Sequence, residues 1–167
     1  QFGGAAANVA TWLGIEGQPC NLIGAVGDDL FGDLFRRRFA TLPINQSLYI
    51  SPLKTGSVIA ISHPDHERSM LSDLGANADI SYAFNESQIT KDAIVYVSGY
   101  VLFQATNHDF IKVILDCAFK RNALLVLDPA SSAPLQQNAS PELLSWIQHF
   151  DIILPNEQEY QTLLQLG

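Results

Sequence analysis

The chain has 167 residues, of which 47% are hydrophobic, so it can bury one sizeable core and its composition argues against disorder. Its formal net charge of −8 argues against nucleic acid as a partner, because neutralising a phosphate backbone requires clustered Lys and Arg. No stretch has the length and apolarity needed to span a bilayer, and no signal-peptide pattern opens the chain, which predicts a cytoplasmic protein without a membrane partner.

A glycine-rich turn, FGGAAAN at residues 2–8, comes first and runs directly into a helix-forming segment. Gly3 and Gly4 allow positive φ angles and close approach of a ligand to the backbone. Asn8, about one turn into the helix, can donate and accept hydrogen bonds with hydroxyl groups. The turn lacks the Lys-Ser/Thr end of a P-loop and the GxGxxG spacing, so it matches neither nucleotide-binding fingerprint. These residues alone are consistent with a ligand-binding turn or with a plain helix start.

Short apolar strands alternate with amphipathic helices along most of the chain. Strands are predicted at 20–26, 93–99, 124–129 and 151–156, and helices at about 30–41, 107–120, 140–149 and after 156. This alternation is typical of an α/β fold with a mostly parallel sheet covered on both faces. In the second of these helices, the 3.6-residue period predicts a core-facing stripe of Phe110, Val113, Ile114, Cys117 and Ala118.

Charged residues bracket the predicted helix at about 30–41. Asp28 and Asp29 precede it, and we interpret them as an N-cap and first-turn acids without a chemical role. The basic run at 36–38 falls near the end of the helix, where we expect a solvated face rather than a nucleic-acid contact.

One segment breaks the alternation, between residues 49 and 73. SLYIS, TGSVIAISH and RSMLSD read as short strands, and HPDHE at 63–67 supplies a turn between the last two. Because a hairpin does not pair easily into a parallel sheet, we expect a flap that stands apart, at about residues 47–73. A flap that closes an active site and an edge extension without a function both fit this pattern.

Polar side chains follow two of the predicted strands. Asn156 and Glu159 have the spacing of a capping box, and they also lie at the carboxyl end of a strand, where α/β sheets bind ligands. Asp128 ends another strand, either as a solvated terminus or as part of the same cleft. Carboxylates there could hold hydrated Mg²⁺, which takes few protein oxygens. The capping and metal-binding interpretations both remain open.

Several segments, in order along the chain, resemble the ribokinase-like (PfkB) carbohydrate kinase family. The similar segments are GGAAANVATWLGIEG, NLIGAVGDDLFGDLF, TGSVIAIS with ERSMLSDLGANADIS, VSGY and ILPNEQEY. They resemble the family's N-terminal signature, lid strands, Ser-Gly strand end and Asn-x-x-Glu motif. The resemblance covers nearly all 167 residues and implies a ribokinase-like α/β domain, 1–167, with a small β lid.

The resemblance also implies an activity, the ATP-dependent transfer of a phosphoryl group to a hydroxymethyl group of a sugar. It implies that Gly3, Gly4 and Asn8 contact the substrate. The expected cofactor side of the site consists of Asn156, Glu159 and Asp128, with Mg²⁺ held by Glu159 and Asn156 through water. The lid would shield the transfer and could pair two copies of the chain. A nucleoside kinase of the same superfamily and a non-catalytic sugar-binding or dimerisation module are the alternatives.

Parts of the family pattern do not occur in these 167 residues. The Gly-Ala-Gly-Asp motif with the catalytic base and anion hole, the adenine-binding loops, the monovalent-cation site and the first strand are all missing. We therefore expect the substrate-and-lid portion of a sugar kinase, truncated at both ends. A polypeptide without a base and an anion hole is expected to have no useful kinase activity by itself.

Overall fold

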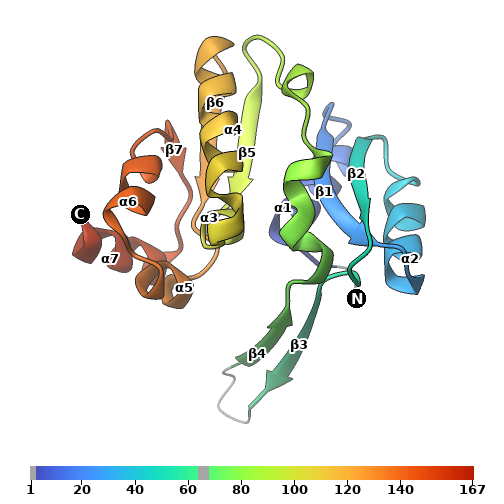
Figure 1. The fold of residues 1–167 in the computed structure, drawn as a ribbon, viewed down its shortest axis with the longest axis horizontal. Coiled ribbons are helices and arrows are strands. Elements are labelled where there is room, and N and C mark those ends of the chain that lie inside the picture. Colours follow the sequence, from blue (N-terminus) through green and yellow to red (C-terminus); the bar gives the residue numbers. More distant parts are fainter. Residues whose placement is uncertain (1–2, 64–67) are drawn as a thin grey trace. The chain divides into compact units, whose positions relative to one another are not determined.

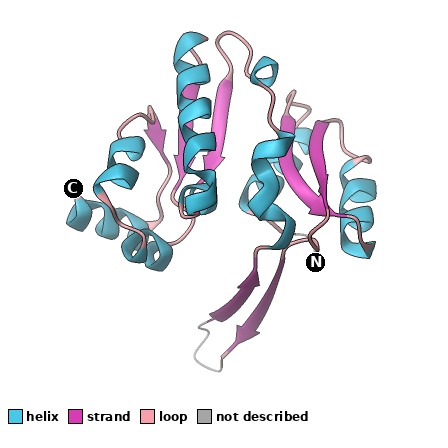
Figure 2. Ribbon diagram, viewed as in Figure 1, coloured by secondary structure: helices cyan, strands magenta, loops and turns pink. Residues whose placement is uncertain are grey.

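The structure is a computed structural model that describes residues 3–63 and 68–167. Contacts along the chain divide it into two compact units, whose main segments are Ala7–Phe84 and Asn85–Gly167. Figure 1 labels the helices and strands of both units, and Figure 2 shows helices beside the strands in each. The turn predicted at 63–67 lies outside the described residues except for His63. No helix in the described part of the chain has both the length and the apolar character needed to cross a membrane.

The first unit is built around a pair of parallel strands. Its elements are α1 (Ala5–Ile15, in this unit from Ala7 onward), β1 (Asn21–Gly27), α2 (Leu30–Phe39), β2 (Asn45–Ser51), β3 (Ser57–Ser62), β4 (Arg68–Asp73) and the 3₁₀ segment η1 (Gly75–Ala83). Strands β1 and β2 run parallel, with Asn21 opposite Asn45 and Gly27 opposite Ser51. The η1 segment packs against both strands. Strands β1 and β2 with α2 between them therefore form a parallel β-helix-β unit.

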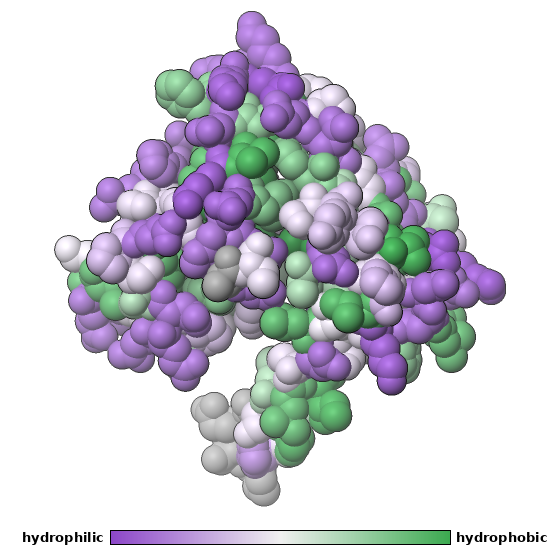
Figure 3. All heavy atoms as spheres, viewed as in Figure 1, coloured by the Kyte–Doolittle hydropathy of each residue, from purple (hydrophilic) through white to green (hydrophobic). Residues whose placement is uncertain are grey.

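Strands β3 and β4 form an antiparallel hairpin that hydrogen-bonds to no other strand among the described residues. Ser57 lies opposite Asp73, and Ser62 lies opposite Arg68. The hairpin is narrower than the predicted insertion at about 47–73, because residues 47–51 belong to β2 and pair in parallel with β1. Apolar side chains are exposed along it, as the green atoms in Figure 3 show. They are Val58, Ile59, Ile61, Met70 and Leu71.

The second unit contains a three-stranded parallel sheet in the order β5-β6-β7. Its elements are η2 (Glu86–Gln88), β5 (Ile94–Ser98), α3 (Gly99–Leu102), η3 (Ala105–Asn107), α4 (His108–Lys120), β6 (Leu124–Asp128), α5 (Ser132–Gln137), α6 (Pro141–Ile147), β7 (Ile152–Ile153) and α7 (Glu157–Leu166). The middle strand, β6, buries Leu125, Val126 and Leu127 in succession. A continuous apolar run of this kind is expected of a parallel strand that is covered on both faces.

Helix α4 shows how the predicted core stripe differs from the observed one. Four of the five predicted side chains are buried, but Val113 is 41% exposed. Ile111 and Leu115 are buried in its place. The buried face of α4 is therefore wider than the predicted stripe and is rotated away from Val113.

Candidate functional site

Asn156 and Glu159 form a closed set of hydrogen bonds where β7 leads into α7. The backbone N–H and the side-chain amide of Asn156 donate to Oε2 and Oε1 of Glu159, at 2.9 and 2.7 Å. The backbone N–H of Glu159 donates to Oδ1 of Asn156 at 2.9 Å. The predicted capping box is thus confirmed. Glu159 is 4% exposed, so its carboxylate is buried with an amide donor on each oxygen.

Asp128 ends β6, and its carboxylate is also held at both oxygens. The hydroxyl group of Tyr96 donates to Oδ2 at 2.6 Å, and the backbone N–H of Ala130 donates to Oδ1 at 2.8 Å. Ala130 has a φ of 70°, in the left-handed region that non-glycine residues seldom adopt. Burial first, and then the hydrogen bond and charge of Asp128, raise the pKa of the Tyr96 phenol, which therefore stays protonated and able to donate.

Asp128 ends β6, Glu159 lies in the first turn of the helix that follows β7, and both carboxylates affect the pKa of Tyr100. Strands β6 and β7 pair in parallel, and the Leu154 N–H continues the pairing by donating to the Leu127 carbonyl oxygen at 2.8 Å. Asp128 and Asn156 therefore follow adjacent strands at the same edge of the sheet. Burial raises the pKa of Tyr100, and the charges of Asp128 and then Glu159 add to this effect. Tyr100 is 45% exposed, and sequence reasoning did not identify it as a site residue.

The chain approaches itself closely at this edge of the sheet. A Cβ atom on Gly99 would lie 2.5 Å from the carbonyl oxygen of Pro129, so only glycine fits between Ser98 and Tyr100. The turn after β6 and the start of α3 are thus held together by backbone contact. This contact fixes the start of α3, the helix that carries Tyr100, next to the residues that follow β6.

Of the two kinds of metal site, direct or through water, the residues at this edge are compatible only with one that holds the ion through water. In the part of the chain that the structure describes, no group of three or more His, Cys, Asp or Glu side chains is arranged to hold a metal ion. Each of the four carboxylate oxygens of Asp128 and Glu159 already accepts a hydrogen bond from the protein. Hydrated Mg²⁺ needs few direct protein ligands, and the remaining lone pairs can accept hydrogen bonds from its waters. The role of Asn156 and Glu159 in holding Mg²⁺ through water remains a prediction.

The glycine-rich turn at the N-terminus is open to solvent. Gly4 has a φ of 105°, so the turn uses the positive φ that the sequence predicts. A Cβ atom on Gly3 would meet nothing within 4 Å. Asn8 is exposed on α1, and its side chain makes no hydrogen bond within residues 3–63 and 68–167. The turn is therefore accessible, and its role in substrate binding remains a prediction.

A polar cluster at the base of the hairpin was predicted only in part. Asp29 caps α2 by accepting from the Gly32 N–H at 2.8 Å, which confirms the N-cap interpretation. It also accepts from the hydroxyl and the N–H of Thr55, at 2.6 and 2.8 Å. The Thr55 hydroxyl in turn accepts from the Gly27 N–H at 2.9 Å. These hydrogen bonds, with that of the Thr55 side chain first, lower the pKa of Asp29 to about 2.

The sequence matches the pfkB family of carbohydrate kinases over residues 1–166. The chain therefore belongs to this family. The match agrees with the observed mixed α/β architecture, with parallel sheets and a separate β hairpin.

Solved structures with the same fold come from both sugar and nucleoside kinases. The chain is similar to adenosine kinase from Sinorhizobium meliloti (22% identity, TM-score 0.86) and to fructokinase with bound ATP from Xylella fastidiosa (20%, 0.84). It is also similar to an E. coli protein described as ribokinase II, in complex with ATP and Mg²⁺ (21%, 0.80). The matches cover 98%, 98% and 96% of this chain, but 51%, 54% and 53% of those chains. The chain thus spans about half the length of these proteins.

Proposed function

We propose that the chain is part of an ATP-dependent kinase that phosphorylates a hydroxymethyl group of a sugar. The observation that carries this proposal is the match to the pfkB carbohydrate kinases over residues 1–166. The similar structures with bound ATP, and with ATP and Mg²⁺, support the choice of cofactors.

In this proposal, Asp128, Asn156 and Glu159 form the side of the site that binds MgATP. Phosphoryl transfer needs little covalent chemistry from the protein, so positioning and charge neutralisation provide most of the rate enhancement. Mg²⁺, when bound, would neutralise charge on the phosphates. In this proposal, the protein orients carboxylate and amide groups toward the waters of the ion, and the capping box supports it by fixing the position of the Glu159 carboxylate.

The substrate side of the proposed site consists of Gly3, Gly4 and Asn8. The open backbone of the turn allows close approach of a hydroxylated ligand, and the exposed amide of Asn8 can both donate and accept hydrogen bonds. The β3–β4 hairpin serves as a lid that excludes water during transfer. The Gly-Ala-Gly-Asp motif, from which the resemblance implies the catalytic base and the anion hole, does not occur in these 167 residues, so we expect this polypeptide alone to be inactive.

A coupled assay of ADP release on the full-length gene product tests the proposal. Pentoses, hexoses, keto-deoxy sugar acids and nucleosides are offered separately at saturating MgATP. We expect turnover with a sugar. Turnover with adenosine-like compounds alone identifies a nucleoside kinase of the same superfamily. If calorimetry detects sugar binding but no acceptor causes ADP to form from ATP, the result supports the non-catalytic module instead.

We also propose that the hairpin pairs two copies of the chain. Val58, Ile59, Ile61, Met70 and Leu71 expose apolar surface along both strands, and pairing would remove part of it from water. Sedimentation velocity of the full-length product should show a dimer that Leu71→Lys shifts to monomer. A monomeric unmodified protein at high micromolar concentration contradicts the pairing.

A further inference from the structure

Tyr96 reaches Asp128 across neighbouring strands of the parallel sheet. In the register of β5 and β6, Tyr96 lies opposite Val126, and Asp128 lies two residues further along. Residues two apart on a strand project from the same face, so Tyr96 and Asp128 are diagonal neighbours on one face. The phenol hydroxyl of Tyr96 donates a 2.6 Å hydrogen bond to Oδ2 of Asp128.

Neutral donors alone orient the Asp128 carboxylate. Tyr96 binds one oxygen and the Ala130 N–H binds the other, so rotation of the carboxylate breaks at least one hydrogen bond. No Lys or Arg side chain forms an ion pair with Asp128 in the part of the chain that the structure describes. The carboxylate is therefore fixed in orientation while its negative charge stays unpaired.

We propose that Tyr96 is a positioning residue, which holds the carboxylate of Asp128 in the orientation that MgATP binding requires. The inference rests on the proposed function, which assigns Asp128 to the MgATP side of the site. Tyr96 itself does not contact the nucleotide in this proposal. A phenol suits this role because, unlike Lys or Arg, it orients a carboxylate without cancelling its charge.

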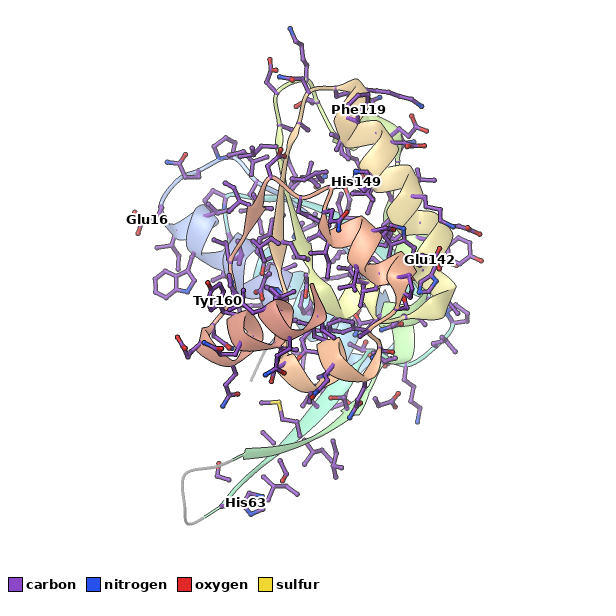
Figure 4. All side chains as sticks on the ribbon, turned by 90° about the vertical axis from the view of Figure 1, so that its left-hand side faces the viewer. Glu16, His63, Phe119, Glu142, His149 and Tyr160 are labelled. Atoms are coloured by element: carbon purple, nitrogen blue, oxygen red, sulfur yellow. The ribbon has the colours of Figure 1, made fainter. Side chains whose placement is uncertain are left out.

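Binding of MgATP in the absence of sugar tests the inference without turnover. Isothermal titration calorimetry is performed on the full-length gene product and on Tyr96→Phe, which removes only the hydroxyl group. We expect about tenfold weaker MgATP binding, the scale of losing one hydrogen bond to a charged group. The control is Tyr160→Phe on α7, because Tyr160 is 49% exposed and its hydroxyl makes no hydrogen bond among the described residues (Figure 4). This control should bind MgATP like the unmodified protein.

A double-mutant cycle tests whether Tyr96 acts through Asp128. Asp128→Asn should weaken MgATP binding by itself, and adding Tyr96→Phe in that background should cause little further loss. If Asp128→Asn leaves affinity unchanged, the assignment of Asp128 in the proposed function fails. If Asp128→Asn weakens binding but Tyr96→Phe does not, or if the two losses add fully, the inference about Tyr96 fails alone.

Two further measurements separate positioning from a general effect on the fold. Melting temperatures show whether Tyr96→Phe remains folded at the titration temperature. Tyr96→His keeps a side-chain donor and should bind MgATP more tightly than Tyr96→Phe, even if both variants are less stable. A lower melting temperature with unchanged MgATP affinity, or equal weakening by the His and Phe variants, overturns the proposal.

Discussion

Three carboxylates, those of Asp29, Asp128 and Glu159, are held by neutral donors rather than by cations. Thr55 and Gly32 bind Asp29, Tyr96 and Ala130 bind Asp128, and Asn156 binds Glu159. Among the described residues, no Lys or Arg forms an ion pair with any of the three. Their positions differ, because Asp29 connects the start of α2 to the base of the hairpin, whereas Asp128 ends β6 and Glu159 lies in the first turn of α7.

The lowered pKa of Asp29 predicts a specific dependence of stability on pH. Because the folded-state pKa of about 2 is below the usual value near 3.9, the ionised carboxylate stabilises the fold above about pH 4. This contribution is lost as the pH falls through the folded-state pKa. Asp29→Ala should therefore destabilise the protein at pH 7, and the difference from the unmodified protein should shrink toward pH 2. Urea unfolding at pH 7, 4, 3 and 2 measures the effect.

Asp28→Ala is the matched control for Asp29→Ala. Asp28 is exposed, and its side chain makes no hydrogen bond in the described part of the chain. Its removal should leave unfolding almost unchanged at every pH. A constant difference between Asp29→Ala and the unmodified protein from pH 7 to pH 2 would contradict the role given to the Asp29 carboxylate.

Replacing Glu159 separates capping from metal binding. Glu159→Gln keeps one of the two oxygens that accept from Asn156, so most of the cap should survive with a small loss in melting temperature. In the full-length product, the Mg²⁺ concentration for half-maximal activity should rise about tenfold, because the charge is lost. A reduced melting temperature with unchanged Mg²⁺ dependence would assign Glu159 to capping alone.

At the scale of elements, the base of the hairpin depends on close backbone contacts. Gly75, after β4, has a φ of 45°, and a Cβ atom there would clash with the Lys54 carbonyl oxygen before β3. The Ala76 N–H donates to that same oxygen at 2.7 Å. The two ends of the hairpin are thus joined directly, which limits how the hairpin can move relative to β1 and β2.

Gly75→Ala should destabilise the protein by about 1–3 kcal/mol, because alanine at this φ is strained and its methyl group displaces the Lys54 carbonyl. Chemical denaturation followed by circular dichroism measures the loss. Gly24→Ala in β1 is the control, since its Cβ would lie 3.5 Å from Leu48 Cδ2, an ordinary contact. Equal stability of the two variants would show that the hairpin base tolerates a side chain.

The elements that sequence reasoning predicted well have local causes. The capping box of Asn156 and Glu159 and the N-cap of Asp29 depend on residues three apart, and the structure contains both. The assignment of residues 47–51 to the insertion was wrong, because pairing with β1 determines where β2 belongs. Val113 was predicted to be buried from helical period alone, but the orientation of α4 depends on what it packs against.

At the scale of the whole molecule, two compact units predict separate unfolding transitions. The buried side chains of the first unit are mostly small, whereas the second buries large ones such as Ile111, Leu127 and Trp146. More apolar area removed from water gives greater stability. The second unit is therefore expected to unfold at a higher denaturant concentration than the first.

The two tryptophans allow this prediction to be measured on the 167-residue chain. Trp12 is 66% exposed in the first unit, and Trp146 is 4% exposed in the second. In a Trp12→Phe variant, tryptophan fluorescence reports on Trp146 alone and therefore on the second unit. The urea midpoint measured by this fluorescence should be higher than the midpoint measured by far-UV circular dichroism, which reports on both units. Coincident midpoints would indicate one cooperative transition instead.

The sequence by itself determined the α/β alternation, the hairpin, the helix caps and the resemblance to the family, because each depends on residues close together in the chain. Only the tertiary structure decided which distant side chains meet. Tyr96 and Asp128 are 32 residues apart, and Asp29 and Thr55 are 26 apart. Strand register and close backbone approach bring such pairs within hydrogen-bond distance, and neither is encoded in the spacing of residues along one segment.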